Sequence, residues 1–336
     1  MSFDRQLVAS VVSQARLAPS THNTQPARWL FQNDGSIHIL ADTNRFLPVC
    51  DPTNRDAGLS CGAAAEGTLM ALVANGYKLD ITEDIWLSGE TDESGNRLAG
   101  ILQPVKKPDV LALNEQVETR FTWRGHFEKA EPQQCTDLET WVEQTEDVVL
   151  VNKANDIAKL AELNDAASLI TMRDKAFRLE LIEWMRLNKN HPDFLNDGLN
   201  FESMQMSGLE ATAAGIVLGT PVFNIMDGLG LAKSIVGEKS KTLSATAIAL
   251  FHRPRDESPF ITGRYFYRFW LHLARLGFAA WPMAVVADHE VTAAEISRHF
   301  SIPDSHRLIN ALRVGIAPKK PPRARLPVAE LILNRD

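Results

Sequence analysis

Apolar residues recur with two different periods in the first part of the chain. Those of the segment 7–15 have the spacing of a helix, so we predict an amphipathic helix that ends before Pro19. Two short strands are expected at 29–31 and 37–40, because Asn33-Asp34-Gly35 between them is typical of a hairpin turn. The sequence therefore predicts a helix followed by a β-hairpin.

The second part of the chain mixes helices and strands. From Pro104 the sequence becomes polar and proline-marked, so we place a boundary there between two halves, 1–105 and 106–336. Residues 189–240 have weak periodicity, which favours a helical insertion that acts as a lid. The other predicted elements are strands at 148–151, 246–251, 283–287 and 312–316, and helices near 156–188, 266–273, 292–299 and 304–311.

The order of the elements favours an α+β fold. It lacks the regular alternation of a doubly wound parallel sheet, so we expect an antiparallel or mixed sheet sandwiched by helices. A weak internal echo adds to this picture. The segments near 58–77 and 263–282 are both predicted helices that begin with glycine and end in a glycine-aromatic pair, Gly76-Tyr77 and Gly277-Phe278. The echo predicts two related halves.

Composition indicates a soluble globular protein that needs no disulfide or metal. Of 336 residues, 45% are hydrophobic and 23% are charged, which excludes a disordered or collagen-like chain. The net charge of −7 argues against a dedicated nucleic-acid binder. Three cysteines without CxxC spacing suggest neither a disulfide framework nor a cysteine zinc site.

We expect a cytoplasmic protein without a membrane span. The N-terminus shows no secretory signal, because Asp4 and Arg5 stand where the apolar stretch would begin. The most apolar region, 215–236, is interrupted by proline, asparagine, aspartate and glycine. It falls short of the roughly 18 uninterrupted apolar residues that a spanning helix needs.

Three short segments carry candidate chemistry. The first, Ala18-Pro-Ser-Thr-His-Asn-Thr-Gln-Pro26, is a loop dense in hydrogen-bonding side chains and bounded by prolines. It suits a rigid binding loop, although a simple helix stop and turn would have the same composition. Ser20 and His22 could also be taken for a nucleophile and base of a hydrolytic site, but no GxSxG elbow is present.

The other two segments are rich in arginine. In Arg120-Phe-Thr122-Trp-Arg124, two guanidinium groups flank a hydroxyl, a grouping that suits a phosphate or another planar anion. The tail repeats the spacing with Arg323 and Arg325. Each could instead be a solvated charged face, and the tail gains significance if it folds back beside Arg120 and Arg124.

Other common site motifs are absent from the sequence. The nine histidines show no HExxH or other compact ligand spacing, so no metal site is expected. Neither GxGxxG nor GxxxxGK[ST] follows a predicted strand, which argues against a Rossmann dinucleotide site or a P-loop.

Together, in this order, the segments resemble the nitroreductase family of FMN-dependent oxidoreductases. APSTHNTQPARW is similar to the family's AP-S-x-x-N-x-QPW loop, with Ala27 where the tryptophan usually stands. RFTWR is similar to its R-x-S-x-R flavin motif and RARLP to its K-S-R-L-P phosphate contact. LARLGFAAWPM resembles the helix and turn beside the flavin ring. In ordinary members R-x-S-x-R comes first, so the order here implies a fused pseudo-dimer that retains one of two flavin sites. In this it is similar to the Acg-type branch, whose central insertion forms a lid.

The resemblance implies a cofactor-binding role for ten residues. The FMN phosphate and ribityl side would contact Arg120, Thr122, Arg124, Arg323 and Arg325. Ser20, Asn23 and Gln25 would contact the ring system, and Pro282 and Met283 would lie near the N5 edge. Many members carry a Glu-Gly pair after this proline, and Met283-Ala284-Val285 replaces it here. Since that region helps to position nicotinamide, the electron donor is left open between NADH, NADPH and another donor.

Three functions are compatible with these features. The first is an FMN-dependent oxidoreductase that uses NAD(P)H to reduce nitroaromatic, quinone or similar small-molecule acceptors by ping-pong hydride transfer through flavin N5. The second is an FMN storage or sequestering protein with little or no turnover. The third is an anion-binding or hydrolytic domain that uses Ser20 and His22. A fused pseudo-dimer would be a monomer or a weak homodimer.

Overall fold

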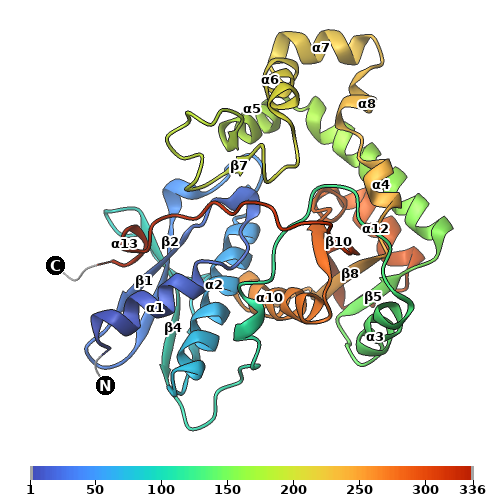
Figure 1. The fold of residues 1–336 in the computed structure, drawn as a ribbon. Coiled ribbons are helices and arrows are strands. Elements are labelled where there is room, and N and C mark those ends of the chain that lie inside the picture. Colours follow the sequence, from blue (N-terminus) through green and yellow to red (C-terminus); the bar gives the residue numbers. More distant parts are fainter. Residues whose placement is uncertain (1–2, 334–336) are drawn as a thin grey trace.

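Two four-stranded antiparallel sheets form the framework of the computed structural model, which describes residues 3–333 (Figure 1). The first sheet has the order β1-β2-β4-β3 and the second has the order β5-β8-β10-β9. The first is built from β1 (Ala27–Phe31), β2 (Ile37–Asp42), β4 (Asn96–Pro104) and β3 (Leu79–Asp84). The second is built from β5 (Val148–Val151), β8 (Ala247–Pro254), β10 (His306–Gly315) and β9 (Ala279–Pro282).

The two sheets belong to halves with one topology. In the first half the chain runs through α1 (Arg5–Ala15), β1, β2, α2 (Arg55–Ala74), β3 and β4. In the second half α3 (Pro132–Glu143), β5, β8, α10 (Pro259–Arg275), β9 and β10 follow in the same sequence. The prediction of an α+β fold with two related halves is confirmed. The boundary at residues 105 and 106 falls between β4 and α3 and stays a prediction.

The echoed helices α2 and α10 pack directly against each other between the two halves. A Cβ atom on Gly62 would lie 1.8 Å from the Phe260 carbonyl oxygen, and one on Gly263 would lie 2.1 Å from that of Leu59. Each glycine thus faces the residue three positions before the other glycine. The contact is pseudo-symmetric, and the two helices can lie this close together only because neither position carries a side chain.

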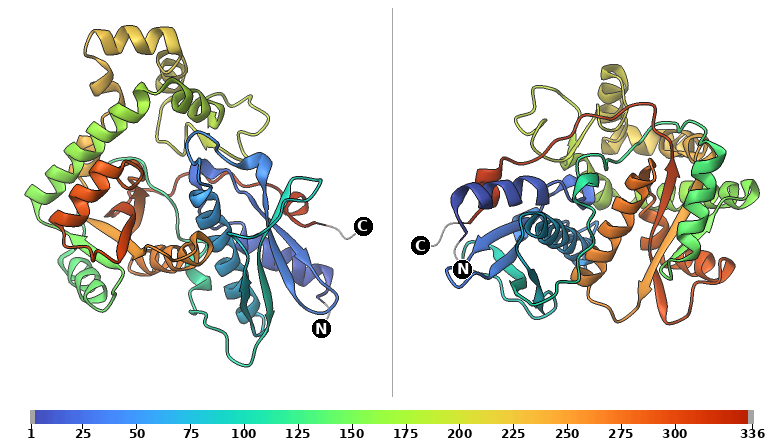
Figure 2. Two further views of the ribbon diagram at one scale, coloured as in Figure 1. Left: turned by 180° about the vertical axis from the view of Figure 1, so that it is seen from behind. Right: turned by 60° about the horizontal axis from the view of Figure 1, so that its bottom comes forward.

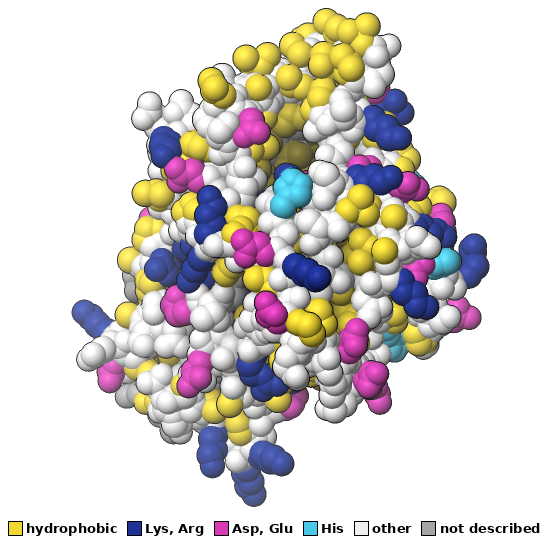
Figure 3. All heavy atoms as spheres, turned by 45° about the vertical axis from the view of Figure 1, so that its right-hand side comes forward, with side chains coloured by type: hydrophobic (Ala, Val, Ile, Leu, Met, Phe, Trp, Pro, Cys, Tyr) yellow, Lys and Arg dark blue, Asp and Glu magenta, His cyan; other side chains and the backbone are white. Residues whose placement is uncertain are grey.

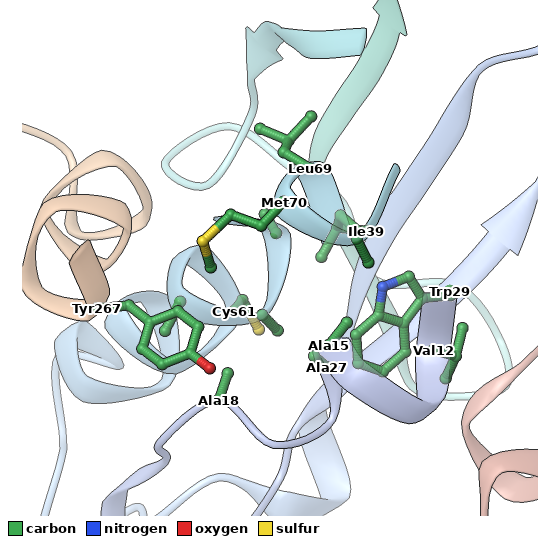
Figure 4. Packing of buried hydrophobic residues seen from close by; sticks show 14 of the residues in the cluster. Val12, Ala15, Ala18, Ala27, Trp29, Ile39, Cys61, Leu69, Met70 and Tyr267 are labelled. Atoms are coloured by element: carbon green, nitrogen blue, oxygen red, sulfur yellow. The ribbon is translucent and has the colours of Figure 1, made fainter. Parts of the chain in front are cut away.

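The halves share a hydrophobic core. Tyr267 of α10 is fully buried and points into the core of the first half beside Ala18 and Met70 (Figure 4). Helix α2 is long and apolar enough to cross a membrane, but 83% of its apolar window is buried. It is therefore the central helix of this core. The bent pair α6 and α7, described next, passes the same test only when the two helices are joined.

An inserted segment joins β5 to β8, where the first half has only a hairpin. Its strands β6 (Met185–Arg186) and β7 (Leu199–Asn200) pair in parallel. The inserted helices, which lie toward the top of Figure 1, are α4 (Ala154–Arg173), α5 (Lys175–Glu183), α6 (Gly208–Val217), α7 (Thr220–Gly228), α8 (Ala232–Val236) and α9 (Lys239–Leu243). The single helix predicted at 156–188 is wrong: Asp174 is extended, and its side chain accepts from the backbone N–H groups of Ala176 and Phe177 to start a new helix.

Two further predictions at the C-terminal end are wrong. The helix expected at 304–311 is part of β10, which lies between β8 and β9 and is buried over most of its length, so its apolar run does not alternate. The strand expected at 283–287 is the short helix α11 (Val285–Asp288). The predicted helix near 292–299 is confirmed as α12 (Glu290–His299). Strands β3 and β4 had no prediction.

After β10 the chain crosses back to the first half (Figure 2). The tail ends in α13 (Val328–Leu331), which packs on α1 and β1, and Ile332 forms a parallel bridge with Trp29. This crossing carries the arginines of the tail to the loop between α1 and β1.

Candidate functional site

A cavity of about 450 Å³ lies between the two halves and beneath the inserted segment. Its volume falls in the range of small-molecule and cofactor sites. The structure brings eight of the ten predicted residues into its lining: Ser20, Asn23, Arg120, Thr122, Arg124, Pro282, Arg323 and Arg325. Gln25 and Met283 lie outside the lining; Met283 is buried in a core cluster of the second half.

The tail does fold back beside Arg120. Nη2 of Arg323 donates to the Arg120 carbonyl oxygen at 2.6 Å, and Nη2 of Arg120 donates to the Leu17 carbonyl oxygen at 2.6 Å. Nε of Arg325 donates to the Arg16 carbonyl oxygen at 2.8 Å. Backbone oxygens of the first half therefore orient the guanidinium groups of Arg120 and Arg325, which come from the second half.

These arginines have almost no carboxylate to balance them. Among residues 3–333 the one acidic partner of the group is Glu118, which is 3.7 Å from Arg323 and 72% exposed. Burial lowers the pKa of Arg120 to about 10, and burial also lowers the pKa of Arg325 well below its ordinary value, with Arg120 and Arg323 adding to the effect on Arg325. A bound anion would compensate for the desolvation of these guanidinium groups and would reduce the repulsion between them.

Two buried donors in the lining have no partner. Arg120 is 3% exposed and its Nε makes no hydrogen bond to any atom of residues 3–333, and the indole Nε1 of Trp270, 2% exposed, makes none there either. The guanidinium of Arg120 lies 4.8 Å from the centroid of the Trp270 ring. Because buried donors are nearly always paired, these two atoms point to a ligand with acceptor groups.

The loop between α1 and β1 is held in an unusual conformation. Its short 3₁₀ helix spans Thr21–Asn23, and His22, Asn23 and Gln25 have φ of 48°, 57° and 52°. Non-glycine residues in this region store strain of about 1–3 kcal/mol each. The hydroxyl of Ser20 accepts from the Gln25 backbone N–H at 3.0 Å and fixes the turn. Such a cluster of strained residues is typical of a functional loop.

Asn23 and Gln25 join the loop to the tail and to the inserted segment. Nδ2 of Asn23 donates to the Gly198 carbonyl oxygen at 3.1 Å, while its Oδ1 accepts from Arg325 at 2.7 Å. Nε2 of Gln25 donates to the Asn196 carbonyl oxygen at 2.9 Å, and its Oε1 accepts from the Leu326 N–H. Gln25 thus holds three segments together, and the ring contact expected of it stays a prediction.

The inserted segment supplies an apolar roof. Six of its apolar side chains line the cavity, together with Ser203, Glu238 and Lys241: Leu181, Met185, Leu199, Met204, Met206 and Leu218. An ion pair of 3.0 Å between Arg45 and Asp197 holds the roof to the first half, and Glu180 accepts from the backbone N–H groups of Val49 and Cys50. On the outer side, α6 and α7 carry exposed apolar side chains, which gather at the top of Figure 3.

A second part of the lining combines aromatic, basic and acidic groups. Trp281 and Pro282 come from β9, and Asn310 of β10 has an unpaired Oδ1. Arg124 makes no hydrogen bond or ion pair among the described residues, and burial lowers its pKa to about 10. Asp56 at the start of α2 and Asp288 at the end of α11 also line the cavity.

Sequence reasoning missed several of these groups. Trp270 follows Phe266 on the apolar stripe of α10 and could not be told from a core residue. Asp56 and Asp288 stand far apart in the chain and match no motif, so no local signal pairs them. Only the packing of the two halves brings them to one cavity.

The structure does not bring Ser20 and His22 together as a nucleophile and base. The hydroxyl of Ser20 bonds the Gln25 backbone, and Nδ1 of His22 has no partner. Asp56 accepts from Thr21 and makes no bond to His22. Burial lowers the pKa of His22 to about 4. Within residues 3–333 no group of three or more His, Cys, Asp or Glu side chains could hold a metal ion.

Comparisons with known proteins agree with the resemblance over part of the chain. No family model matches. The chain is 37% identical over 75 residues to "Putative NAD(P)H nitroreductase acg" of Mycobacterium tuberculosis, which is 22% of each protein. It is 32% identical over 79 residues, 23% of each protein, to an uncharacterised protein of the same organism. The matches span less than a quarter of these relatives.

Solved structures of nitroreductases are similar at low identity. The FMN- and NADPH-dependent nitroreductase NfnB of Sphigopyxis sp. strain HMH is 14% identical, with a TM-score of 0.36 over 67% of this chain and 100% of that one. A "putative nitroreductase" of Anabaena variabilis is 10% identical, with a TM-score of 0.47 over 94% of this chain and 90% of that one. Scores of this size do not define a fold, which here rests on strand order and pairing.

Proposed function

We propose that the protein is an FMN-dependent oxidoreductase that takes electrons from NAD(P)H and reduces small planar acceptors. One observation carries the proposal: buried guanidinium groups without a matching carboxylate converge on a cavity that also has unpaired buried donors and aromatic walls. The phosphate of FMN has the charge and the acceptor oxygens that this arrangement lacks. The partial match to a relative named as an NAD(P)H nitroreductase supports the same reading.

The chain's own residues would bind and orient the cofactor. Arg120, Arg323 and Arg325 would hold the phosphate, with Thr122 and Arg124 nearby in the lining. Ser20 and Asn23 would bound the ring from the first half, and Pro282 from the second. When bound, FMN supplies hydride chemistry that the protein side chains cannot perform. The roof of leucine and methionine would exclude water and adapt to acceptors of different outline.

The test is the visible absorption spectrum of the purified protein before and after anaerobic addition of NADH or NADPH. We expect a flavin spectrum that bleaches, and then recovers when a quinone or nitroaromatic compound is added. A protein that is colourless and takes up no added FMN would overturn the proposal. A flavin spectrum that bleaches with dithionite but with neither nicotinamide would leave FMN in place and replace the donor.

Storage of FMN is the second candidate, and the roof favours it. The inserted segment is tied to the first half through Asn23, Gln25, Arg45 and Glu180, which would enclose a bound cofactor. Steady-state oxidation of NAD(P)H in the presence of a quinone would rule it out. The expected small-molecule partner, the monomeric or weakly dimeric state and the cytoplasmic location stay predictions.

A further inference from the structure

Asp56 of the first half and Asp288 of the second half meet in the lining of the cavity, on either side of Arg55, which lies behind the lining. Nε of Arg55 lies 3.4 Å from Oδ1 of Asp56, and its Nη2 donates to Oδ1 of Asp288. Asp51 is the third carboxyl of the group: it is 6% exposed and accepts from the Ala57 backbone N–H at 2.9 Å. Among residues 3–333, Arg55 is the one cation bonded to any of these three carboxyls, so the arrangement favours keeping a proton on one of them.

Of these carboxyls, Asp288 is the one with a free oxygen at the cavity. Asp56 uses Oδ2 to accept from the Thr21 hydroxyl at 3.1 Å. For Asp288, only Oδ1 is bonded among residues 3–333, and 40% of its side chain is accessible. Because Asp288 lines the cavity and its Oδ2 has no bond among residues 3–333, this oxygen is free to bond a ligand.

The electrostatic surroundings agree with this geometry. Partial withdrawal from water, together with the nearby Asp56 and Asp51 and against the opposing effect of Arg55, raises the pKa of Asp288 to about 7. Burial likewise raises the pKa of Asp51 to about 6. His22, with its pKa lowered to about 4, is neutral near pH 7 and has no extra proton to give. The other charged or titratable groups that face this cluster are Cys50 and Glu180 from the first half and the roof, Arg124, and Arg307 of β10.

We propose that Asp288 is the proton donor for quinone reduction in this cavity. The inference rests on the proposed function, since it needs a hydride source there. The quinone takes up a hydride from the reduced cofactor, which is thereby oxidised, and a proton from Asp288. The O–H bond of Asp288 breaks, a new O–H bond completes the hydroquinone, and solvent returns a proton to the carboxylate. Quinones that reach Oδ2 of Asp288 with a carbonyl oxygen are the acceptors this site would favour.

The first experiment reads the proton itself and needs no turnover. Infrared difference spectra of the purified protein between pH 5.5 and pH 8.5 detect the C=O stretch of protonated carboxyls. Asp51, with its pKa raised to about 6, also contributes to this band, so we expect the component that titrates near pH 7 in the parent protein to be lost in Asp288→Asn, and to persist in Glu290→Gln, which changes an exposed acid on the neighbouring helix α12. An unchanged band in Asp288→Asn would overturn the assignment.

The second experiment measures quinone reduction in single turnovers with the cofactor reduced beforehand. A donor must hold its proton, so the rate should fall as pH rises through about 7 in the parent. Asp288→Asn should be slower by about 100-fold or more and lose this pH dependence, with FMN affinity unchanged; Asp288→Glu should restore part of the rate.

The outcomes separate the two proposals. A protein that takes up no FMN would refute the proposed function. Normal FMN binding with the parent's pH profile in Asp288→Asn would refute the role of Asp288 alone.

Discussion

The cavity has a counterpart on the other side of the α2–α10 pair, and the counterpart is filled. Gly62 of α2 and Gly263 of α10 are equivalent positions in the two halves. Counting from them, Arg264 is equivalent to Ala63, and Arg268 is equivalent to Gly67. Ala63 lines the cavity, whereas Arg264 and Arg268 both donate to Glu66, at 2.8 and 2.6 Å. The small side chain of Ala63 leaves room for a ligand where the matching Arg264 of α10 occupies the space.

The sheets show the same difference. The register of the two sheets gives the equivalent positions. Leu102 of β4 pairs with Ile81 of β3, and Leu312 of β10 pairs with Pro282 of β9 in the same way. Counting from these pairs, Gly100 is equivalent to Asn310, and Asp80 is equivalent to Trp281. Asn310 and Trp281 line the cavity. On the filled side, a Cβ on Gly100 would lie 2.6 Å from the Phe260 ring, and Asp80 is 3.2 Å from Arg264.

The comparison shows that equivalent positions of the two halves can form a ligand cavity in one place and a buried structural cluster in the other. On the filled side two guanidiniums surround the fully buried Glu66 and neutralise it. On the cavity side the arginines Arg120, Arg323 and Arg325 have no buried carboxylate, and the carboxyls have too few cations. Charge left unmatched on the cavity side is available for a ligand, which supports a single cofactor site.

The largest effect is expected from Glu66→Ala, which breaks the filled side. It leaves Arg264 and Arg268 buried with their main carboxylate removed, and such losses cost about 3–5 kcal/mol. Urea denaturation of the parent and the variant measures the free energy of unfolding. An exposed acid of the same half, Glu93→Ala, should change it by under about 0.5 kcal/mol. A Glu66→Ala variant with nearly the same free energy of unfolding as the parent would show that the cluster does not stabilise the halves.

Ala63→Arg copies the filled side into the cavity. The new side chain would extend into the space proposed for FMN, and we expect affinity to fall at least about 100-fold, or about 2.8 kcal/mol. Fluorescence titration with FMN measures the loss, and circular dichroism checks that the fold is kept. Ala63→Ser, which adds one oxygen, serves as the matched control. Undiminished FMN binding in Ala63→Arg would place the cofactor elsewhere.

Arg120→Ala removes one guanidinium from the unmatched group. Hydrogen bonds to charged groups contribute about 1.5–3 kcal/mol, so FMN affinity should drop about 10- to 100-fold. The control is Arg275→Ala, an exposed arginine at the end of α10. Full flavin occupancy of the Arg120 variant at low FMN concentration would contradict the assignment.

The smallest effect concerns the surplus carboxyls of the cavity side. Burial raises the pKa of Asp51 to about 6, so the folded state keeps a proton that the unfolded state releases near pH 4. Its stabilising contribution is therefore present below about pH 4 and is lost as pH rises through about 6. The contribution of Asp51 to the free energy of unfolding should fall between pH 4.5 and 7.5 in the parent protein. In Asp51→Asn this fall should be smaller by about 1 kcal/mol, measured by urea denaturation at each pH. An identical slope in both proteins would show that Asp51 does not titrate there.

The sequence by itself determined the features that depend on neighbours along the chain. The periodic stripe gave α1, the Asn-Asp-Gly turn gave the β1–β2 hairpin, and the repeated arginine spacing marked both basic segments of the cavity. Each of these is encoded within about ten residues, so no long-range contact was needed to recognise it.

The tertiary structure alone decided the rest. Residues 306–311 became part of a strand because β8 pairs with them, while β9 pairs with the rest of the same strand, and Gln25 became a tie between three segments. Asp56 and Asp288 share a cavity only because the halves pack through Gly62 and Gly263. Burial, charge balance and the choice between an open and a filled site arise from residues some two hundred positions apart, where periodicity carries no information.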